Sequence, residues 1–182
     1  MRDPHLFHFS EDPLIARFEP RPVRVPAERG PGRGWLNGPL VWAIDAWRQP
    51  MYFFPRDCPR ILLWRKPATT EADLRRWWRG GAHRRMLAHI EDAWLERLKT
   101  TPVYRYVFDP EPFEDIGDVG MWVSRVAVEP VAVEPVGDLP SALHAADVEL
   151  RVMPDLLPLK GVWDSTLHAS GIRLRNAAGW NV

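Results

Sequence analysis

The chain has little cysteine, no excess of charge and no long apolar segment, and each absence argues against a class of protein. Cys58 is the only cysteine among 182 residues, so no disulfide can form within the chain. This is typical of a reducing compartment, and we expect a cytoplasmic protein. Basic and acidic residues number 24 each, so no overall field favours nucleic acid or an anionic membrane.

Segments that direct a chain to a membrane, and common catalytic motifs, are also missing. The opening MRDPHLFHFSEDP lacks the basic stretch and apolar core of a secretory signal, and no apolar run approaches the ~20 residues that cross a bilayer. No GxGxxG, GxxxxGK[ST], HExxH, GxSxG or CxxC pattern occurs. His5 and His8 would face opposite sides of a strand, and we expect no metal site.

Ten tryptophans and nineteen prolines are the unusual abundances. The prolines indicate many short segments, and the length indicates a single domain over residues 1–182. Strands are predicted where apolar residues alternate or run continuously between turn residues. These segments are 6–9, 40–44, 61–64, 103–108, 120–124 and 148–152.

Helical spacing of apolar residues predicts one long amphipathic helix over residues 83–98. A shorter helix is expected after Thr70, which is a good N-cap residue, and another from Ser141 to Ala146. A C-terminal helix is expected from Asp164 onward. The fold class predicted is therefore α+β, with a mixed, mainly antiparallel sheet.

Residues 20–39 are rich in proline, glycine and arginine and are predicted to form a loop. This loop is either a solvated connection or a basic flap over an anionic ligand. It follows LFHFSEDPLIARFEPR, residues 6–21, in which a strand bearing His8 and Ser10 meets the turn at Asp12. We expect a capped helical turn after Asp12 and a pocket edge along this strand.

HFSEDP and FPRDCPR, together with VWAID, YRYVFDP and the closing STLHASGIRLRNA, resemble a family of short, uncharacterised bacterial proteins. The resemblance covers most of the chain but carries no activity with it. More distantly, His8 and Ser10 are similar to the H-x-[ST] start of ADP-ribosyltransferase-like domains. In that family the histidine and the hydroxyl hold the ribose of NAD.

The second resemblance implies a site for NAD or ADP-ribose. Tyr52 would stack on nicotinamide, as an aromatic of the second strand does in that family. Arg21 could pair with the pyrophosphate. The family's catalytic glutamate does not match, because Met121 or Trp122 occupies its place and Glu129 lies several residues later.

If the chain transfers ADP-ribose, the candidate catalytic residues are His8, which the resemblance assigns, and Glu129, which is a carboxylate of the right type. The candidate cofactor-binding residues are His8, Ser10 and Tyr52, which the resemblance assigns, together with Arg21, which follows the motif. Hydrogen bonds to the ribose, a stacked aromatic and a carboxylate are the groups that an oxocarbenium-like transition state requires. Each of these side chains also has an ordinary structural interpretation, since a strand histidine can bond to the main chain and Tyr52 can be a core aromatic.

The alternative function is a non-catalytic interaction module that uses exposed tryptophans beside arginines, above all Trp77 and Trp78. Arginines from Arg75 to Arg85 allow nucleic-acid binding in principle, although nearby acidic residues make a solvated surface the plainer interpretation. Cys58 lies between two arginines that would favour its thiolate, or it is a small buried apolar residue.

Overall fold

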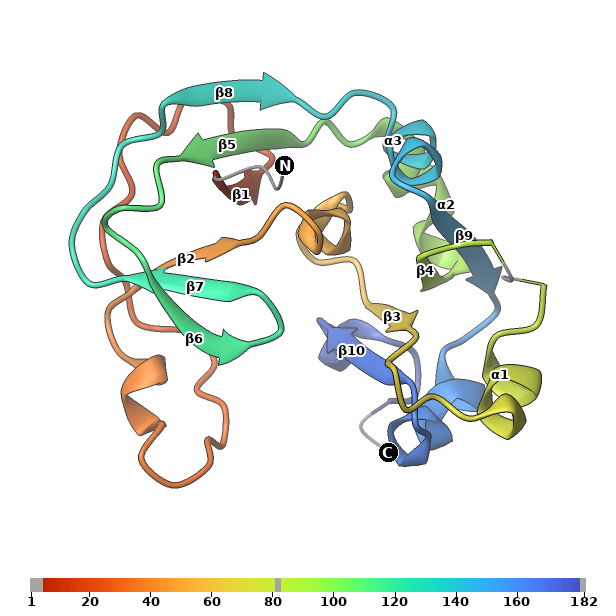
Figure 1. Cartoon of the computed structure of the whole chain (residues 1–182). Coiled ribbons are helices and arrows are strands. Elements are labelled where there is room, and N and C mark those ends of the chain that lie inside the picture. The colour runs from red at the N-terminus through yellow and green to blue at the C-terminus, as the bar shows by residue number, and fades with distance from the viewer. Residues whose placement is uncertain (1–4, 81–82, 181–182) are drawn as a thin grey trace. The chain divides into compact units, whose positions relative to one another are not determined.

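The computed structural model describes residues 5–80 and 83–180 and divides into two compact units (Figure 1). Unit 1 comprises residues 1–49 and 104–135, and unit 2 comprises residues 50–103 and 136–182. Each unit is described by itself below. The expectation of a single domain over the whole chain stays a prediction.

Unit 1 contains one six-stranded sheet in the order β6-β7-β2-β1-β5-β8, with every neighbouring pair antiparallel. Its strands are β1 (Leu6–Ser10), β2 (Val41–Ile44), β5 (Tyr104–Phe108), β6 (Glu114–Asp118), β7 (Met121–Ser124) and β8 (Ala132–Pro135). The alternating segments at the start of the chain and at 103–108 are therefore strands, as predicted. β8 contains Pro135 and lies at the sheet edge, where proline costs no ladder hydrogen bond.

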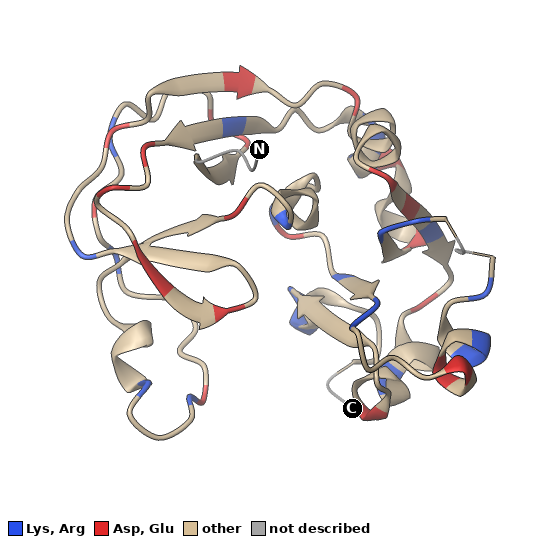
Figure 2. Ribbon diagram, viewed as in Figure 1, with Lys and Arg blue, Asp and Glu red and all other residues tan. Residues whose placement is uncertain are grey.

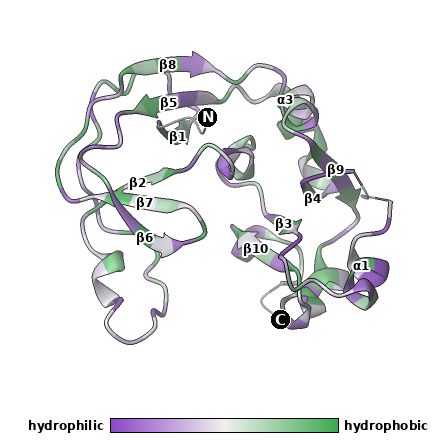
Figure 3. Cartoon of the chain, viewed as in Figure 1, coloured by the Kyte–Doolittle hydropathy of each residue, from purple (hydrophilic) through white to green (hydrophobic). Residues whose placement is uncertain are grey.

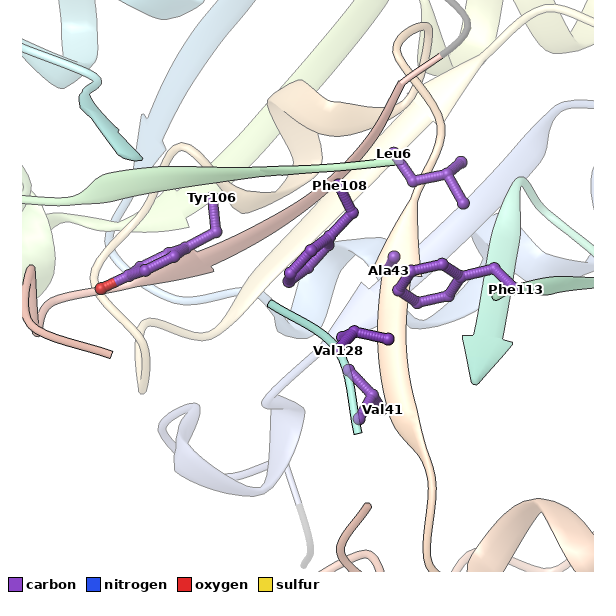
Figure 4. Close-up of a cluster of buried hydrophobic side chains, with 7 residues drawn as sticks. All are labelled: Leu6, Val41, Ala43, Tyr106, Phe108, Phe113 and Val128. Carbon is purple, nitrogen blue, oxygen red and sulfur yellow. The ribbon is translucent and has the colours of Figure 1, made fainter. Parts of the chain in front are cut away.

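The core of unit 1 is a cluster of apolar and aromatic side chains on one face of this sheet (Figure 4). Its members come from neighbouring strands and from the loops beside them. They are Leu6, Val41, Ala43, Tyr106, Phe108, Phe113 and Val128. Ile15 and Phe18 pack against it, and Phe18 pairs with Val128 through two main-chain hydrogen bonds. The segment after β1 therefore covers the core face.

Residues 20–39 form the predicted loop, which Figure 3 colours mostly white to purple before the 3-10 helix η1 (Gly34–Asn37). The helical turn expected after Asp12 is wrong. The Asp12 carboxylate instead accepts a hydrogen bond from the Leu14 amide, and Leu14 is 85% exposed. This local side-chain hydrogen bond holds an Asx-type turn, which competes with helix formation.

Unit 2 contains a four-stranded mixed sheet in the order β10-β3-β4-β9, in which only β4 and β9 are parallel. The strands are β3 (Arg60–Trp64), β4 (Met86–Glu91), β9 (Val148–Met153) and β10 (His168–Ile172). The α-helices are α1 (Glu71–Trp77), α2 (Leu95–Thr100) and α3 (Leu139–Ala145). The 3-10 helices are η2 (Gln49–Tyr52, which begins at the last residue of unit 1), η3 (Asp92–Trp94), η4 (Leu157–Asp164) and η5 (Leu174–Asn176).

The long helix predicted over residues 83–98 is wrong. Residues 86–91 form the interior strand β4, every residue of which is buried. An α-helix begins only at Leu95, near the end of the predicted span, and runs to Thr100. Leu87 and Ile90 lie three apart, which matches one helical face, but both are buried here because the strand is covered on its two faces. Apolar spacing alone did not distinguish these cases.

The C-terminal helix is also wrong, since residues 168–172 form β10 and pair with β3 over five residues. The helix after Thr70 is confirmed as α1, and the Thr70 hydroxyl accepts the Asp73 amide as an N-cap. The helix near Ser141 is confirmed as α3. Its cap is Asp138 rather than Ser141, because the Asp138 carboxylate accepts the Ser141 amide.

The fold class is α+β, as predicted, with two sheets rather than one. Basic and acidic residues are interspersed in both units, and α1 carries both signs of charge (Figure 2). Within residues 5–80 and 83–180, no helix combines the length and apolar character needed to span a bilayer.

Candidate functional site

His8 and Ser10 lie on the same face of β1, because residues two apart on a strand point to the same side. Leu6 shares this face and belongs to the core cluster, so the two polar side chains continue an apolar row. His8 is half-buried, and its ring makes a T-shaped contact with the Phe18 ring at a centroid distance of 4.9 Å.

The imidazole of His8 replaces part of the hydrogen-bond ladder between β1 and β2. Its Nδ1 lies 2.9 Å from the carbonyl oxygen of Trp42. Phe7 faces Ile44 in the register, so continued pairing would place Phe9 opposite Trp42. Within the described residues, β1 and β2 pair at one position only, Phe7 with Ile44, whereas β1 and β5 pair over five positions.

This hydrogen bond also sets the tautomer of His8. A carbonyl oxygen only accepts, so Nδ1 carries the proton and donates it to Trp42. In the neutral ring Nε2 is then the acceptor nitrogen. An acceptor of this kind suits a hydroxyl donor such as that of a ribose.

Ser10 is 8% exposed, and its Oγ accepts the main-chain amide of Asp12 at 3.1 Å. Tyr106, which faces His8 across the β1–β5 pair, holds the same segment. Its hydroxyl accepts the Ile15 amide at 3.2 Å and donates to the Asp12 carbonyl. Burial raises the pKa of Tyr106, so the group stays a neutral donor. Tyr106 was missed as a site residue, because its position opposite His8 depends on the pairing of β1 with β5 and not on the alternation of residues 103–108.

Arg21 lies in the loop and is exposed. Its main chain pairs with Leu40 through two hydrogen bonds of 3.2 and 3.1 Å, which fix the loop beside β2. No side-chain hydrogen bond or ion pair joins the Arg21 guanidinium to another part of the chain that the structure describes. The guanidinium is thus available to an anion.

Glu129 follows Val128, whose side chain belongs to the core, so on extended chain the glutamate points the other way. Its side chain is 69% exposed and pairs with Arg17 at 3.4 Å. Tyr52 belongs to unit 2, in η2, where the Arg60 guanidinium lies 5.6 Å from its ring centroid. The convergence of Tyr52 with His8, Ser10 and Arg21 stays a prediction.

Cys58 has no exposed surface, and burial raises the pKa of its thiol to about 11. Its nearby arginines act in the opposite direction but do not outweigh the loss of solvation. The buried, apolar interpretation of this cysteine is therefore confirmed, and the thiolate interpretation is wrong.

The tryptophans proposed for partner binding are less exposed than expected. Trp78 is 4% exposed, so its expected exposure is wrong, and Trp77 is half-buried with the Arg76 guanidinium 4.7 Å from its ring centroid. The tryptophans with the largest exposure lie elsewhere in the sequence. They are Trp35, Trp47 and Trp163.

Metal ligands do not gather in the described residues. Across 5–80 and 83–180, no group of three or more histidine, cysteine, aspartate or glutamate side chains is placed to hold an ion. The most unusual polar residue is instead Arg60, a buried guanidinium at the start of β3. Sequence reasoning missed it as a functional candidate because a basic residue in a proline-flanked turn is ordinarily solvated.

Comparison with known proteins places this chain in a family without a described activity. Residues 7–177 match the family described as "Family of unknown function (DUF6886)". The chain belongs to this family. No curated protein and no solved structure matches it significantly. The predicted uncharacterised family is consistent with this result, whereas the match carries no link to ADP-ribosyltransferases or to bacteria.

Proposed function

We propose that unit 1 binds the ADP-ribosyl part of NAD, or ADP-ribose itself, along the His8 face of β1. The hydrogen bond from His8 Nδ1 to Trp42 carries this proposal, because it orients the ring and makes Nε2 an acceptor. The H-x-[ST] resemblance assigns the same two side chains, His8 and Ser10, to a ribose.

Two further features of unit 1 suit a sugar-phosphate. Ser10 Oγ accepts the hydrogen bond from the Asp12 amide, so the hydroxyl can still donate its own proton to a ligand oxygen. Arg21, held beside β2 by its main-chain pairing with Leu40, offers a planar guanidinium to a phosphate. Both elements belong to unit 1 and need no group from unit 2.

The proposal is one of binding and does not include transfer. Glu129 has a side chain that is 69% exposed and already pairs with Arg17. A general base or an orienting carboxylate works best in a site that excludes water. The exposed position of Glu129 therefore gives no support to a catalytic role for it.

The deciding variant is His8→Asn, because the asparagine amide places a donor near the position of Nδ1 but has no counterpart of Nε2. We expect this variant to keep the hydrogen bond to Trp42 and the fold, and to bind ADP-ribose about tenfold more weakly, the effect of losing one hydrogen bond. Isothermal titration calorimetry with ADP-ribose and NAD measures the change. His8→Gln is the complementary variant, since it retains an acceptor farther out and loses the contact with Trp42.

His144→Ala serves as the matched control, because His144 is exposed on α3 of unit 2. It should bind both ligands like the wild type. Absence of binding by the wild type, or equal affinities for wild type and His8→Asn, would contradict the proposal.

A further inference from the structure

Arg60 is a buried cation with an unusual set of partners. It is 2% exposed, and its guanidinium donates from Nε to the Met51 carbonyl at 2.7 Å and from Nη1 to the Cys58 carbonyl at 2.9 Å. The rings of Phe54 and Tyr52 lie 5.0 and 5.6 Å from its central carbon. Carbonyl oxygens and aromatic faces solvate the charge but do not neutralise it.

No carboxylate of the described residues forms an ion pair with Arg60, and its Nη2 makes no hydrogen bond with them. Buried charges in proteins are ordinarily paired, because removing an ion from water is costly. Burial lowers the pKa of Arg60 to about 10, and the charge of Arg173 acts in the same direction. The guanidinium still holds its proton at neutral pH, so the positive charge lacks a counter-ion among residues 5–80 and 83–180.

A second guanidinium adds to this charge. Arg60 faces Ile172 across the β3–β10 pair, so the turn that follows Ile172 begins beside it. Arg173, the first residue of that turn, has φ +56 and donates from Nε to the Arg56 carbonyl at 3.3 Å. Its pKa is lowered by burial first, and then by the charges of Arg175 and Arg56.

The arginines outnumber the acidic groups in this part of unit 2. Asp57 Oδ1 lies 3.8 Å from Arg173 Nε, at the outer limit of an ion pair, and 59% of the Asp57 side chain is exposed. Asn176 holds the loop by donating to the Asp57 carbonyl at 2.7 Å. The FPRDCPR segment and the 173–176 turn therefore keep several positive charges close together against repulsion.

We propose that Arg60 and Arg173 form a binding site for a phosphoryl group, with Arg60 Nη2 as the inner donor. An oxyanion would supply the missing counter-ion and accept several charge-assisted hydrogen bonds, for which the planar guanidinium is suited. Tyr52 lines the same site, since its ring lies over Arg60. The site stands on residues of unit 2 alone and does not depend on the function proposed for unit 1.

Titration with inorganic pyrophosphate and phosphate at constant ionic strength tests the site. Wild-type protein should bind pyrophosphate, and Arg173→Gln should bind it about tenfold more weakly or worse, as expected for one lost charge-assisted hydrogen bond. Arg65→Gln is the matched control, because Arg65 is exposed beyond the other end of β3 and stacks on Trp78. Its affinity should equal that of the wild type.

Arg60→Lys sharpens the assignment, since lysine keeps the charge but not the planar donor fork. We expect weaker pyrophosphate binding with the far-ultraviolet circular dichroism of the wild type. If this variant does not fold, Arg173→Gln decides by itself. His8→Asn should leave pyrophosphate binding unchanged, which separates this site from the one proposed in unit 1.

Three results would overturn the proposal. The first is the absence of pyrophosphate and phosphate binding by the wild type at millimolar concentration. The second is equal binding by wild type and Arg173→Gln. The third is displacement of pyrophosphate by an equal concentration of acetate, which would assign the site to carboxylates rather than to phosphoryl groups.

Discussion

The two units bury their sheets in different ways. In unit 2 all residues of the interior strands β3 and β4 are buried, whereas in unit 1 the interior strands β1, β2 and β5 each keep half-buried residues. The polar groups differ accordingly. His89 of β4 is 3% exposed, whereas His8 of β1 is only half-buried. The interior strands of unit 1 therefore offer polar side chains on a partly open face, and those of unit 2 hold theirs inside.

The largest expected difference between the units is the cost of shortening a side chain in each sheet. Leu87→Ala in β4 should lower the free energy of unfolding by about 2–5 kcal/mol, because Leu87 is fully buried and a cavity would remain. Val133→Ala in β8 should cost under about 1 kcal/mol, since Val133 is 40% exposed. Urea denaturation followed by tryptophan fluorescence measures both. Equal losses would remove the contrast between the buried strand β4 and the edge strand β8.

The second difference concerns pH. Burial lowers the pKa of His89 from 6.5 to about 4, although its hydrogen bond to the Ile61 carbonyl opposes the shift. The unfolded chain then binds more protons than the folded chain between these values. The stabilisation is complete above pH 6.5 and is lost as the pH falls toward 4, by about 3 kcal/mol in total.

Subtracting the pH profile of a His89→Leu variant from that of the wild type isolates this effect. Urea denaturation at several pH values from 7 to 4 supplies both profiles. The wild type should lose more stability than the variant over this range. Parallel profiles would mean that His89 is protonated in the folded protein and that β4 is less closed than the structure indicates.

A smaller effect is expected at the start of α3. Asp138→Ala should cost about 1 kcal/mol, because the carboxylate accepts the Ser141 amide at 2.9 Å. Ser141→Ala should change stability little, since Ser141 contributes its amide and not its hydroxyl to this cap. Thermal unfolding of the two variants compares them directly. A larger loss for Ser141→Ala would restore the sequence-based assignment of the cap.

The smallest expected effect is the labelling of Cys58 in the folded protein. A thiol with no exposed surface and a pKa of about 11 has little thiolate at pH 7.5 and no path to a reagent. Labelling by iodoacetamide should be slow in buffer and rapid in denaturant, as followed by mass spectrometry. Rapid labelling of the folded protein would show that the FPRDCPR segment opens.

The sequence was informative where one face of a strand is solvated. Residues 6–9 and 103–108 alternate, so the two strands and the shared face of His8 and Ser10 followed from pattern alone, whereas their pairing as β1 and β5 did not. β4 was misassigned because burial on both faces removes alternation and leaves a spacing that also fits a helix. β10 was missed because HASGI has few β-branched residues and gains its pairing from β3.

The candidate sites also contain residues that the sequence predicts and residues that it does not. His8 and Ser10 were predictable as neighbours, but the Trp42 carbonyl that orients His8 depends on the pairing of β1 with β2, which local sequence does not specify. Arg60 was not predictable as a buried cation. Its burial depends on the contacts with Met51 and Phe54, and arginine is rarely inside a protein.

The most direct test of the account is the nitrogen-15 chemical shift of the His8 ring, with and without ADP-ribose. His8→Asn assigns the His8 signals by their disappearance. We expect a neutral ring protonated at Nδ1 in the free protein, with Nε2 changing its shift as the ribose hydroxyl binds. A ring protonated at Nε2, or an Nε2 shift unaffected by ADP-ribose at saturation, would contradict the account.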